Sequence, residues 1–185
     1  MEVFPLRQGA QTADTDGAMH GCLFCKSGSE SEIVRKFEFL FPGSRAIVPL
    51  KTRYRRMGGE AREEDVPMLP GYVFFETEQD LNLRKLLRTQ SVYRLLCYGD
   101  GDWRLHGSDD QFAALLFGMN GKIGISKAFY DEGERIRVID GLMKEYEGFI
   151  IRVNRRARTA EIRIPFQDKQ VSMWLGFELI DKVQA

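Results

Sequence analysis

Long hydrophobic runs are absent from this sequence, and no segment approaches the ~20 apolar residues that a membrane-spanning helix needs. Residues 1–20 also lack the apolar segment of a secretory signal. We therefore expect a cytoplasmic protein that makes no contact with a membrane.

Cysteine and histidine are scarce, with three and two residues respectively. An odd number of cysteines argues against a closed disulfide framework. Cys22 and Cys25 have the spacing of redox and zinc motifs, but they lie in a predicted strand, where positions three apart face opposite sides. His20 and His106 are the only histidines, and no Walker-type phosphate loop or helically spaced carboxylate pair is present. The sequence therefore predicts a protein that is not an enzyme and uses no cofactor or metal.

Net charge is also missing, because 27 Lys and Arg residues balance 27 Asp and Glu residues. Binding to nucleic acid would thus depend on local clusters of cations. One cluster lies between Arg45 and Arg62, and a second occupies a predicted turn near residue 155. The candidate RNA-binding residues in these clusters are Lys51, Arg53, Arg55, Arg56, Arg152, Arg155, Arg156 and Arg158.

The first cluster is read as a basic β-hairpin with Gly58 and Gly59 at its tip. Alternation along the strand would place Lys51, Arg53 and Arg55 on one face, a spacing suited to a row of phosphates. The alternative is a solvated hairpin whose cations pair with the acids of residues 63–65 that follow.

The pattern of the first part of the chain is βαββαβα, which favours an α+β sandwich: a mainly antiparallel sheet with helices against it. Strands are expected over residues 21–26, 45–54, 69–77 and 92–98. Helices are expected after two capping-box patterns, Ser29–Glu32 and Ser108–Gln111, and around Leu83–Leu87.

The sequence further predicts two domains with a disordered leader and a linker. Residues 1–19 lack periodicity and form the leader, and residues 20–117 form the first domain. Residues 118–130 contain three interrupting glycines and are read as the linker. In residues 131–185, short β-rich runs indicate a small five-stranded barrel whose interior takes Ile136, Val138, Ile150 and Ile162.

Three segments resemble the NusG family of transcription elongation factors. Residues 67–75, Pro-Met-Leu-Pro-Gly-Tyr-Val-Phe-Phe, look like the central strand of the family's N-terminal (NGN) domain, and residues 22–30 look like its opening strand and loop. Residues 133–141, with Asp140 and Gly141, open what looks like a KOW motif that Gly148 closes. The resemblance covers residues 22–183 and implies an NGN domain followed by a five-stranded KOW barrel.

The resemblance implies a monomer whose NGN domain binds the clamp helices of RNA polymerase and suppresses pausing. The matching positions are Leu69, Tyr72, Phe129 and Tyr130. The competing interpretation is that Leu69 and its strand neighbours are simply core residues. Tyr72 lies on the strand face opposite Val73 and Phe75, so at least one aromatic side chain needs a second partner.

The KOW loop departs from the family pattern, because Gly141-Leu-Met-Lys-Glu-Tyr146 lacks the usual proline. The family contacts a ribosomal protein or the termination factor Rho here, with Met143 at the matching apolar position. The departure puts both contacts in doubt.

Residues 122–128 and 174–180 look more like LoaP, a NusG paralogue that promotes processive antitermination and is thought to recognise a structured hairpin in the leader transcript. Lys and Arg of the basic hairpin would neutralise RNA phosphates, and a structured helix is recognised largely by shape. The alternatives are a general NusG-like modulator of pausing or termination, and a KOW-based adaptor that binds RNA or the ribosome.

Overall fold

The computed structural model describes residues 17–167 and 169–181. The predicted leader therefore lies almost wholly outside the described residues. Within the described ranges, no helix is long and apolar enough to cross a membrane.

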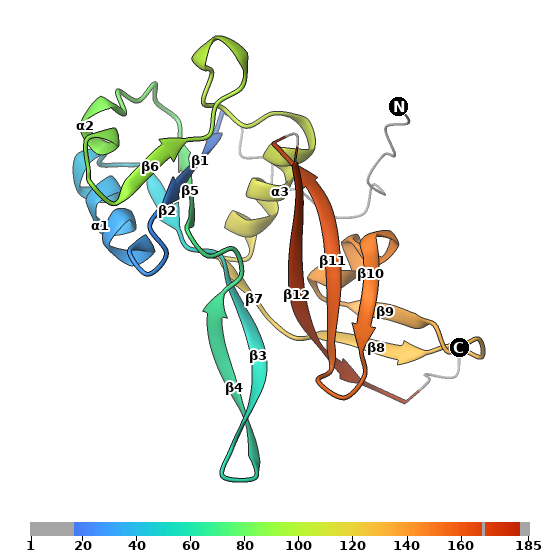
Figure 1. Ribbon diagram of the computed structural model, residues 1–185. Helices are drawn as coiled ribbons and strands as arrows, with labels where there is room; N and C mark the ends of the chain where they lie inside the picture. Colours follow the sequence, from blue (N-terminus) through green and yellow to red (C-terminus); the bar gives the residue numbers. More distant parts are fainter. Residues whose placement is uncertain (1–16, 168, 182–185) are drawn as a thin grey trace.

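A four-stranded antiparallel sheet of order β2-β5-β1-β6 forms the centre of the first part of the chain (Figure 1). Its strands are β1 Met19–Cys25, β2 Arg45–Ile47, β5 Tyr72–Thr77 and β6 Val92–Leu95. Alternation divides the strand residues between two cores. Leu23, Val73 and Phe75 pack with helices α1 (Glu30–Leu40) and α2 (Arg84–Leu87). Cys22 and Phe74 face the other way, towards α3 (Gly107–Gly118).

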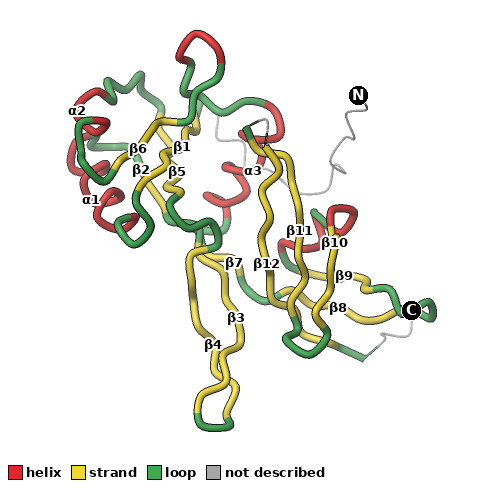
Figure 2. The backbone as a smooth tube through the Cα atoms, viewed as in Figure 1, coloured by secondary structure: helices red, strands yellow, loops and turns green. Residues whose placement is uncertain are grey.

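A long β-hairpin projects from this sheet (Figure 2). It consists of β3 Leu50–Met57 and β4 Glu60–Pro67, and β7 Lys122–Ile123 pairs in parallel with the base of β3. Gly58 and Gly59 form the tip, and both have positive φ, +64° and +91°. The predicted hairpin is therefore confirmed, although its strand does not begin at Arg45. Pro49 follows Val48 between β2 and β3, where it interrupts the extended run.

The last part of the chain forms a curled five-stranded sheet of order β10-β11-β12-β8-β9. Its strands are β8 Ser126–Tyr130, β9 Ile136–Asp140, β10 Ile150–Asn154, β11 Thr159–Phe166 and β12 Lys169–Leu179. Two short helices, α4 Leu142–Glu145 and η2 Glu147–Phe149, connect β9 to β10, and η1 Gly99–Gly101 follows β6. Val138 and Ile162 are buried as predicted, whereas Ile136 and Ile150 are half-buried. The predicted α+β fold with a small five-stranded β domain is confirmed.

Residues 118–130 differ from the irregular linker that their glycines suggest. β7 extends the hairpin sheet, and β8 pairs in parallel with β12 and antiparallel with β9. The three glycines lie outside these strands, which is why short runs between them could still pair. The fifth strand of the curled sheet therefore comes from this segment.

Neither capping box forms in the structure. Ser29 precedes α1 without a side-chain capping bond, and His106, rather than Ser108, is the residue that precedes α3. The acidic side chains bond to more distant partners instead: Asp110 accepts from the ring of His20, and Asp109 accepts from Tyr98. His20 lies in β1, with 3% of its surface exposed.

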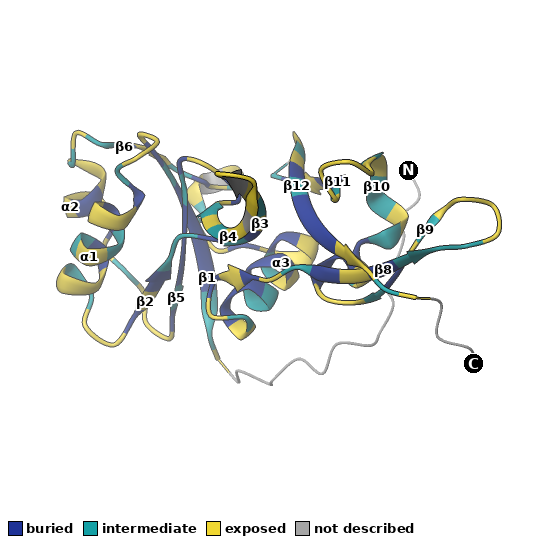
Figure 3. Cartoon of the chain, turned by 90° about the horizontal axis from the view of Figure 1, so that it is seen from below, coloured by how far each residue is buried: buried dark blue, intermediate teal, exposed yellow. Residues whose placement is uncertain are grey.

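One continuous apolar cluster joins α3 to the curled sheet, and Figure 3 shows α3 beside that sheet. Phe112 of α3 lies edge-on to Tyr146 and Phe166, with ring centroids 6.3 and 6.0 Å apart. The curled sheet therefore covers the α3 side of the first sheet, while α1 and α2 cover its other side.

Candidate functional site

The start of β5 is held in place by a buried carboxylate. Glu30, which is 5% exposed, accepts hydrogen bonds from the backbone N–H groups of Gly28 and Gly71, each at 2.7 Å. Gly71 has φ +85°, and a Cβ there would lie 2.9 Å from the carbonyl oxygen of Cys25. The N–H of Cys25 also donates to the carbonyl of Gly71 at 2.7 Å. These bonds fix the backbone that presents Tyr72.

Three aromatic side chains form a row on the α3 side of the first sheet. Phe24 lies between Tyr72 and Tyr93, with ring centroids 5.1 and 5.8 Å away. The guanidinium of Arg94 lies 5.7 Å from the centre of the Phe24 ring. Tyr93 is 61% exposed, whereas Phe24 and Tyr72 are half-buried. We call Phe24, Tyr72 and Tyr93 the aromatic row.

The curled sheet covers one end of the aromatic row. The ring of Phe166 in β11 lies edge-on to the ring of Tyr72, with centroids 6.5 Å apart. Its centroid also lies 5.6 Å from that of the Phe74 ring. Next to it, Asp109 of α3 accepts from the N–H of Gln167 at 3.1 Å and from the hydroxyl of Tyr98 at 2.6 Å. Burial, followed by the bond to Asp109, raises the pKa of Tyr98 to about 12. The phenol therefore stays protonated and keeps this bond over the whole physiological pH range.

The four residues predicted to bind polymerase are not gathered on one surface. Leu69 is 4% exposed and belongs to the buried cluster, while Tyr72 lies in the aromatic row. Phe129 and Tyr130 are half-buried in β8 of the curled sheet, where Arg155 lies 4.5 Å from the Tyr130 ring centre. The residue beside Tyr72 is instead Phe24, which in turn contacts Tyr93; the sequence analysis assigned no role to either.

The predicted basic hairpin carries paired charges. Arg53 and Arg55 both bond to Glu64, at 3.0 and 3.1 Å, and these bonds lower the pKa of the Glu64 carboxyl. Burial and then the charge of Arg53 lower the pKa of Lys51. The side chain of Arg56 lies outside the described side chains. Arg53 and Arg55 therefore pair with one of the acids of residues 63–65, as the alternative interpretation of the hairpin expected.

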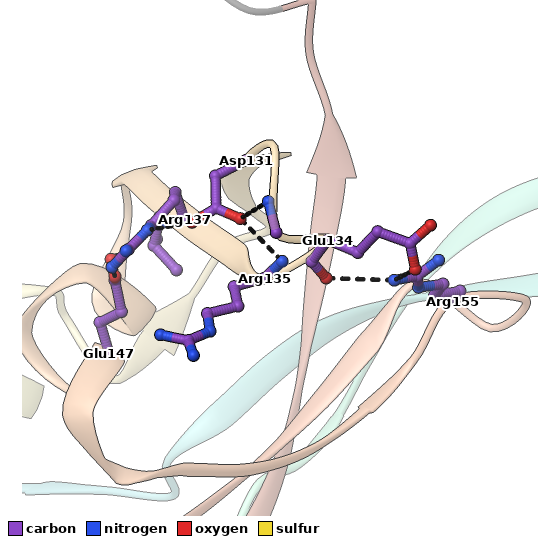
Figure 4. A network of polar contacts seen from close by, with 8 residues as sticks. Asp131, Glu134, Arg135, Arg137, Glu147 and Arg155 are labelled. Atoms are coloured by element: carbon purple, nitrogen blue, oxygen red, sulfur yellow. Dashed lines mark hydrogen bonds and ion pairs between the residues drawn. The ribbon is translucent and has the colours of Figure 1, made fainter.

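The arginines of β10 and of the turn after it are also partly paired, and Figure 4 shows Arg155 with its partner Glu134. Arg155 bonds to the carboxylate and the carbonyl of Glu134, both at 3.1 Å, and Arg152 lies 4.0 Å from Glu161. Arg156 and Arg158 are exposed and join none of the ion pairs of the described residues. Burial and the charge of Glu178 raise the pKa of Tyr54, and the smaller effect of Arg158, which has φ +51°, acts in the opposite direction. The turn and the hairpin therefore share one region of mixed charge.

The KOW-like loop is closely packed. Gly141 has φ +88°, and a Cβ there would lie 2.5 Å from the Ser126 hydroxyl oxygen. The N–H of Gly141 donates to the Asp140 carboxylate at 2.8 Å, while Gly148 lies in η2. Met143, which the resemblance places at a partner contact, is fully buried. Its side chain is therefore unavailable to a partner in this conformation.

The described residues contain no group of His, Cys, Asp and Glu that could hold a metal ion. Cys22 and Cys25 belong to different apolar clusters on the two sides of β1. Burial is the main cause that raises the pKa of both thiols, that of Cys25 to about 11. These thiols are thus placed as core residues.

Comparison with known proteins bears on the part of the chain that holds the aromatic row. The family model described as "Transcription termination factor nusG" matches residues 22–116, just over half of the chain. This chain belongs to the NusG family. The matched range includes residues 22–25 of β1 and all of β5 and β6, so all three residues of the aromatic row lie in the NusG-type region.

Two NusG proteins illustrate the likeness. The transcription termination/antitermination protein NusG of Pseudomonas aeruginosa is 22% identical over 139 residues, which cover 74% of this chain and 78% of that protein. A structure reported as "Domain interaction in Thermotoga maritima NusG" aligns with a TM-score of 0.50 and 16% identity, covering 86% of this chain and 93% of that one. The structural likeness shows that the NusG fold extends over both parts of this NusG-family transcription factor.

Proposed function

We propose that this NusG-family protein binds RNA polymerase through the aromatic row and promotes transcription through terminators. The observation that carries the proposal is the position of Tyr72 and Phe24 side by side on a sheet face, half-buried and fixed by the Glu30 bonds. Rigid aromatic side chains that can be fully desolvated are the usual anchors of a protein interface, and a pair of clamp helices can lie across such a face.

Polymerase can reach the covered end of the aromatic row only after the curled sheet has moved away from it. Phe166 shields Tyr72 and Phe74, so a partner that contacts Tyr72 fully has to displace β11. The measured affinity of a protein that must open first is reduced by the fraction of molecules that are open. We therefore propose that the curled sheet competes with polymerase for the aromatic row.

Phe166→Ala is expected to strengthen polymerase binding about 5-fold, because it weakens the packing of the curled sheet on Tyr72 and leaves the exposed part of the aromatic row unchanged. The dissociation constant is measured by titrating core polymerase at a temperature well below the thermal midpoint of the variant. A midpoint measurement accompanies it, since loss of a buried ring destabilises the fold. Unchanged or weaker binding by a folded variant would argue against competition.

We also propose that a hairpin in the leader RNA recruits this protein, as in LoaP-like regulators. The β3–β4 hairpin supports this, because Lys51, Arg53 and Arg55 alternate with Thr52 and Tyr54 and share one face of a projecting ribbon. The pairing with Glu64 is exposed and therefore contributes little stability, so an RNA phosphate can replace the carboxylate. The proposed domains are NGN, residues 20–117, and KOW, residues 131–185 together with β8.

Reversing the charge of Arg53 and Arg55 (Arg53→Glu, Arg55→Glu) is expected to weaken RNA-hairpin binding about 20-fold and to make its salt dependence shallower, since fewer counterions are released. Glu64→Gln should have the opposite effect. It removes the carboxylate that pairs with both arginines and is expected to strengthen RNA binding about 3-fold. Affinities are measured by fluorescence anisotropy with a labelled leader hairpin at several salt concentrations. The assignment of RNA binding to the β3–β4 hairpin fails if both variants bind the RNA with the affinity and the salt slope of the wild type.

A further inference from the structure

Strand β6 contains an irregularity at the exposed end of the aromatic row. Cys25 of β1 pairs with Val92, but its neighbour Phe24 pairs with Arg94, so Tyr93 is an extra residue in β6. Successive side chains of a regular strand point to opposite faces, and an extra residue, or β-bulge, re-aims the side chains beside it. Tyr93 and Arg94 accordingly both lie beside the ring of Phe24.

The cation that the bulge places there is unpaired. Arg94 is exposed, and none of the ion pairs or side-chain hydrogen bonds within the described residues involves its side chain. Its guanidinium lies over the Phe24 ring, 5.7 Å from the ring centre. A guanidinium over an aromatic face keeps its N–H groups for a planar carboxylate, which it can bind with two parallel hydrogen bonds. Arg94 is therefore ready to receive a carboxylate from a partner.

The two ends of the aromatic row differ in access. Phe166 packs on Tyr72 at one end, whereas Tyr93 at the other end is 61% exposed. A partner can thus reach Tyr93 and Arg94 while the curled sheet still covers Tyr72. Attraction between unlike charges extends over about 10 Å at 0.1 M salt, farther than an apolar contact, and it mainly raises the rate of association. An unpaired cation at the accessible end therefore favours an acidic partner.

We propose that Arg94 and Tyr93 make the first contact with RNA polymerase and select a helix that carries an acidic side chain. The carboxylate binds the guanidinium of Arg94. An apolar side chain one helical turn away lies against Tyr93 and Phe24, since residues three or four apart share one face of a helix. The inference rests on the proposed polymerase contact and adds an order of events to it: the partner reaches Tyr72 only afterwards, when β11 has moved.

The test is the association rate of the labelled full chain with core RNA polymerase free of nucleic acid, measured by stopped-flow fluorescence at several salt concentrations. Arg94→Glu is expected to lower this rate about 10-fold at low salt, and Arg94→Gln about 4-fold. Both differences should shrink at high salt, because salt screens the attraction. Arg35→Glu reverses an exposed arginine of α1, on the other side of the first sheet, and is expected to associate within about 1.5-fold of the wild type.

An exchange of charges identifies the partner residue. Each acidic residue of the polymerase clamp helices is replaced by lysine in turn, and each altered polymerase is mixed with Arg94→Glu. One replacement is expected to restore the association rate to within about 2-fold of the wild-type pair, because it re-creates an attractive pair with the signs exchanged.

Three results would overturn the role of Arg94. In the first, Arg94→Glu and Arg35→Glu associate at the same rate at every salt concentration. In the second, no lysine replacement restores the rate of Arg94→Glu. In the third, Arg94→Glu is slow only with polymerase that carries nucleic acid, which would assign Arg94 to a phosphate. A wild-type protein that does not bind core polymerase would refute the proposed polymerase contact as well, whereas the three results above leave that contact standing.

Discussion

Replacing Tyr72 with alanine is expected to weaken RNA polymerase binding about 30-fold, because an aromatic anchor at the centre of an interface commonly contributes about 2 kcal/mol or more. The ring is half-buried and lies 5.1 Å from Phe24, so it can be desolvated by a partner without leaving its place in the row. Folding should suffer less than binding, since the side chain is not part of the fully buried core. A titration of core polymerase with the labelled full chain measures the effect.

A matched aromatic control is available on the other side of the sheet. Phe39 of α1 is 83% exposed and faces away from the aromatic row. Phe39→Ala removes a large exposed ring, and we expect polymerase affinity within about 2-fold of the wild type, as is usual for residues outside an interface. If Tyr72→Ala and Phe39→Ala behave alike, Tyr72 is not in the polymerase site.

Replacing Glu30 with alanine is expected to lower the free energy of unfolding by about 3 kcal/mol, because two backbone N–H groups lose their acceptor and each unsatisfied buried donor costs roughly 1–3 kcal/mol. The groups are those of Gly28 and Gly71, each 2.7 Å from a Glu30 carboxylate oxygen. Glu30 also lies in the first turn of α1, where negative charge is favourable. Urea denaturation followed by circular dichroism measures the loss.

Glu32→Ala is the control for this change. Glu32 lies in the same helical turn but is exposed, and it bonds to no backbone N–H of β5. We expect it to cost no more than about 0.5 kcal/mol, as for most surface substitutions. Equal losses in the two variants would mean that the helix dipole, and not the bonds to Gly28 and Gly71, accounts for the effect of Glu30.

Alternation and turn chemistry made much of the fold predictable. The period of two along β5 placed Tyr72 on the face opposite Val73 and Phe75, and the structure confirms this division. Gly58 and Gly59 marked the hairpin tip, because only glycine adopts positive φ without strain. The short β-rich runs after residue 135 indicated the curled sheet, whose register follows from burial on one face.

Contacts between residues distant in sequence escaped prediction. Nothing in the pattern around Glu30 separates a buried acceptor from a capping-box acid, because the difference lies in Gly71, which is 41 residues away. The cover that Phe166 places on Tyr72 likewise depends on how the two sheets pack. Phe24 could have been found, since it occupies the same strand face as Cys22 in a segment already matched to the family.

The choice between free and paired cations also needed the structure. In the sequence, basic residues at alternate positions match the spacing of a row of RNA phosphates. In the structure, strand pairing places Glu64 directly opposite Arg53. Arg84, Lys85 and Arg88, which carried no motif, are exposed and join none of the ion pairs of the described residues.

The most direct test of the proposed function is transcription in vitro through a terminator by the cognate polymerase, with and without this protein. The templates either carry or lack the leader of its own operon, and Tyr72→Ala is included. We predict readthrough that requires the wild-type protein and the leader, and that Tyr72→Ala abolishes. Readthrough on both templates would contradict recruitment by leader RNA, and absence of any effect on either template would contradict the proposed antitermination itself.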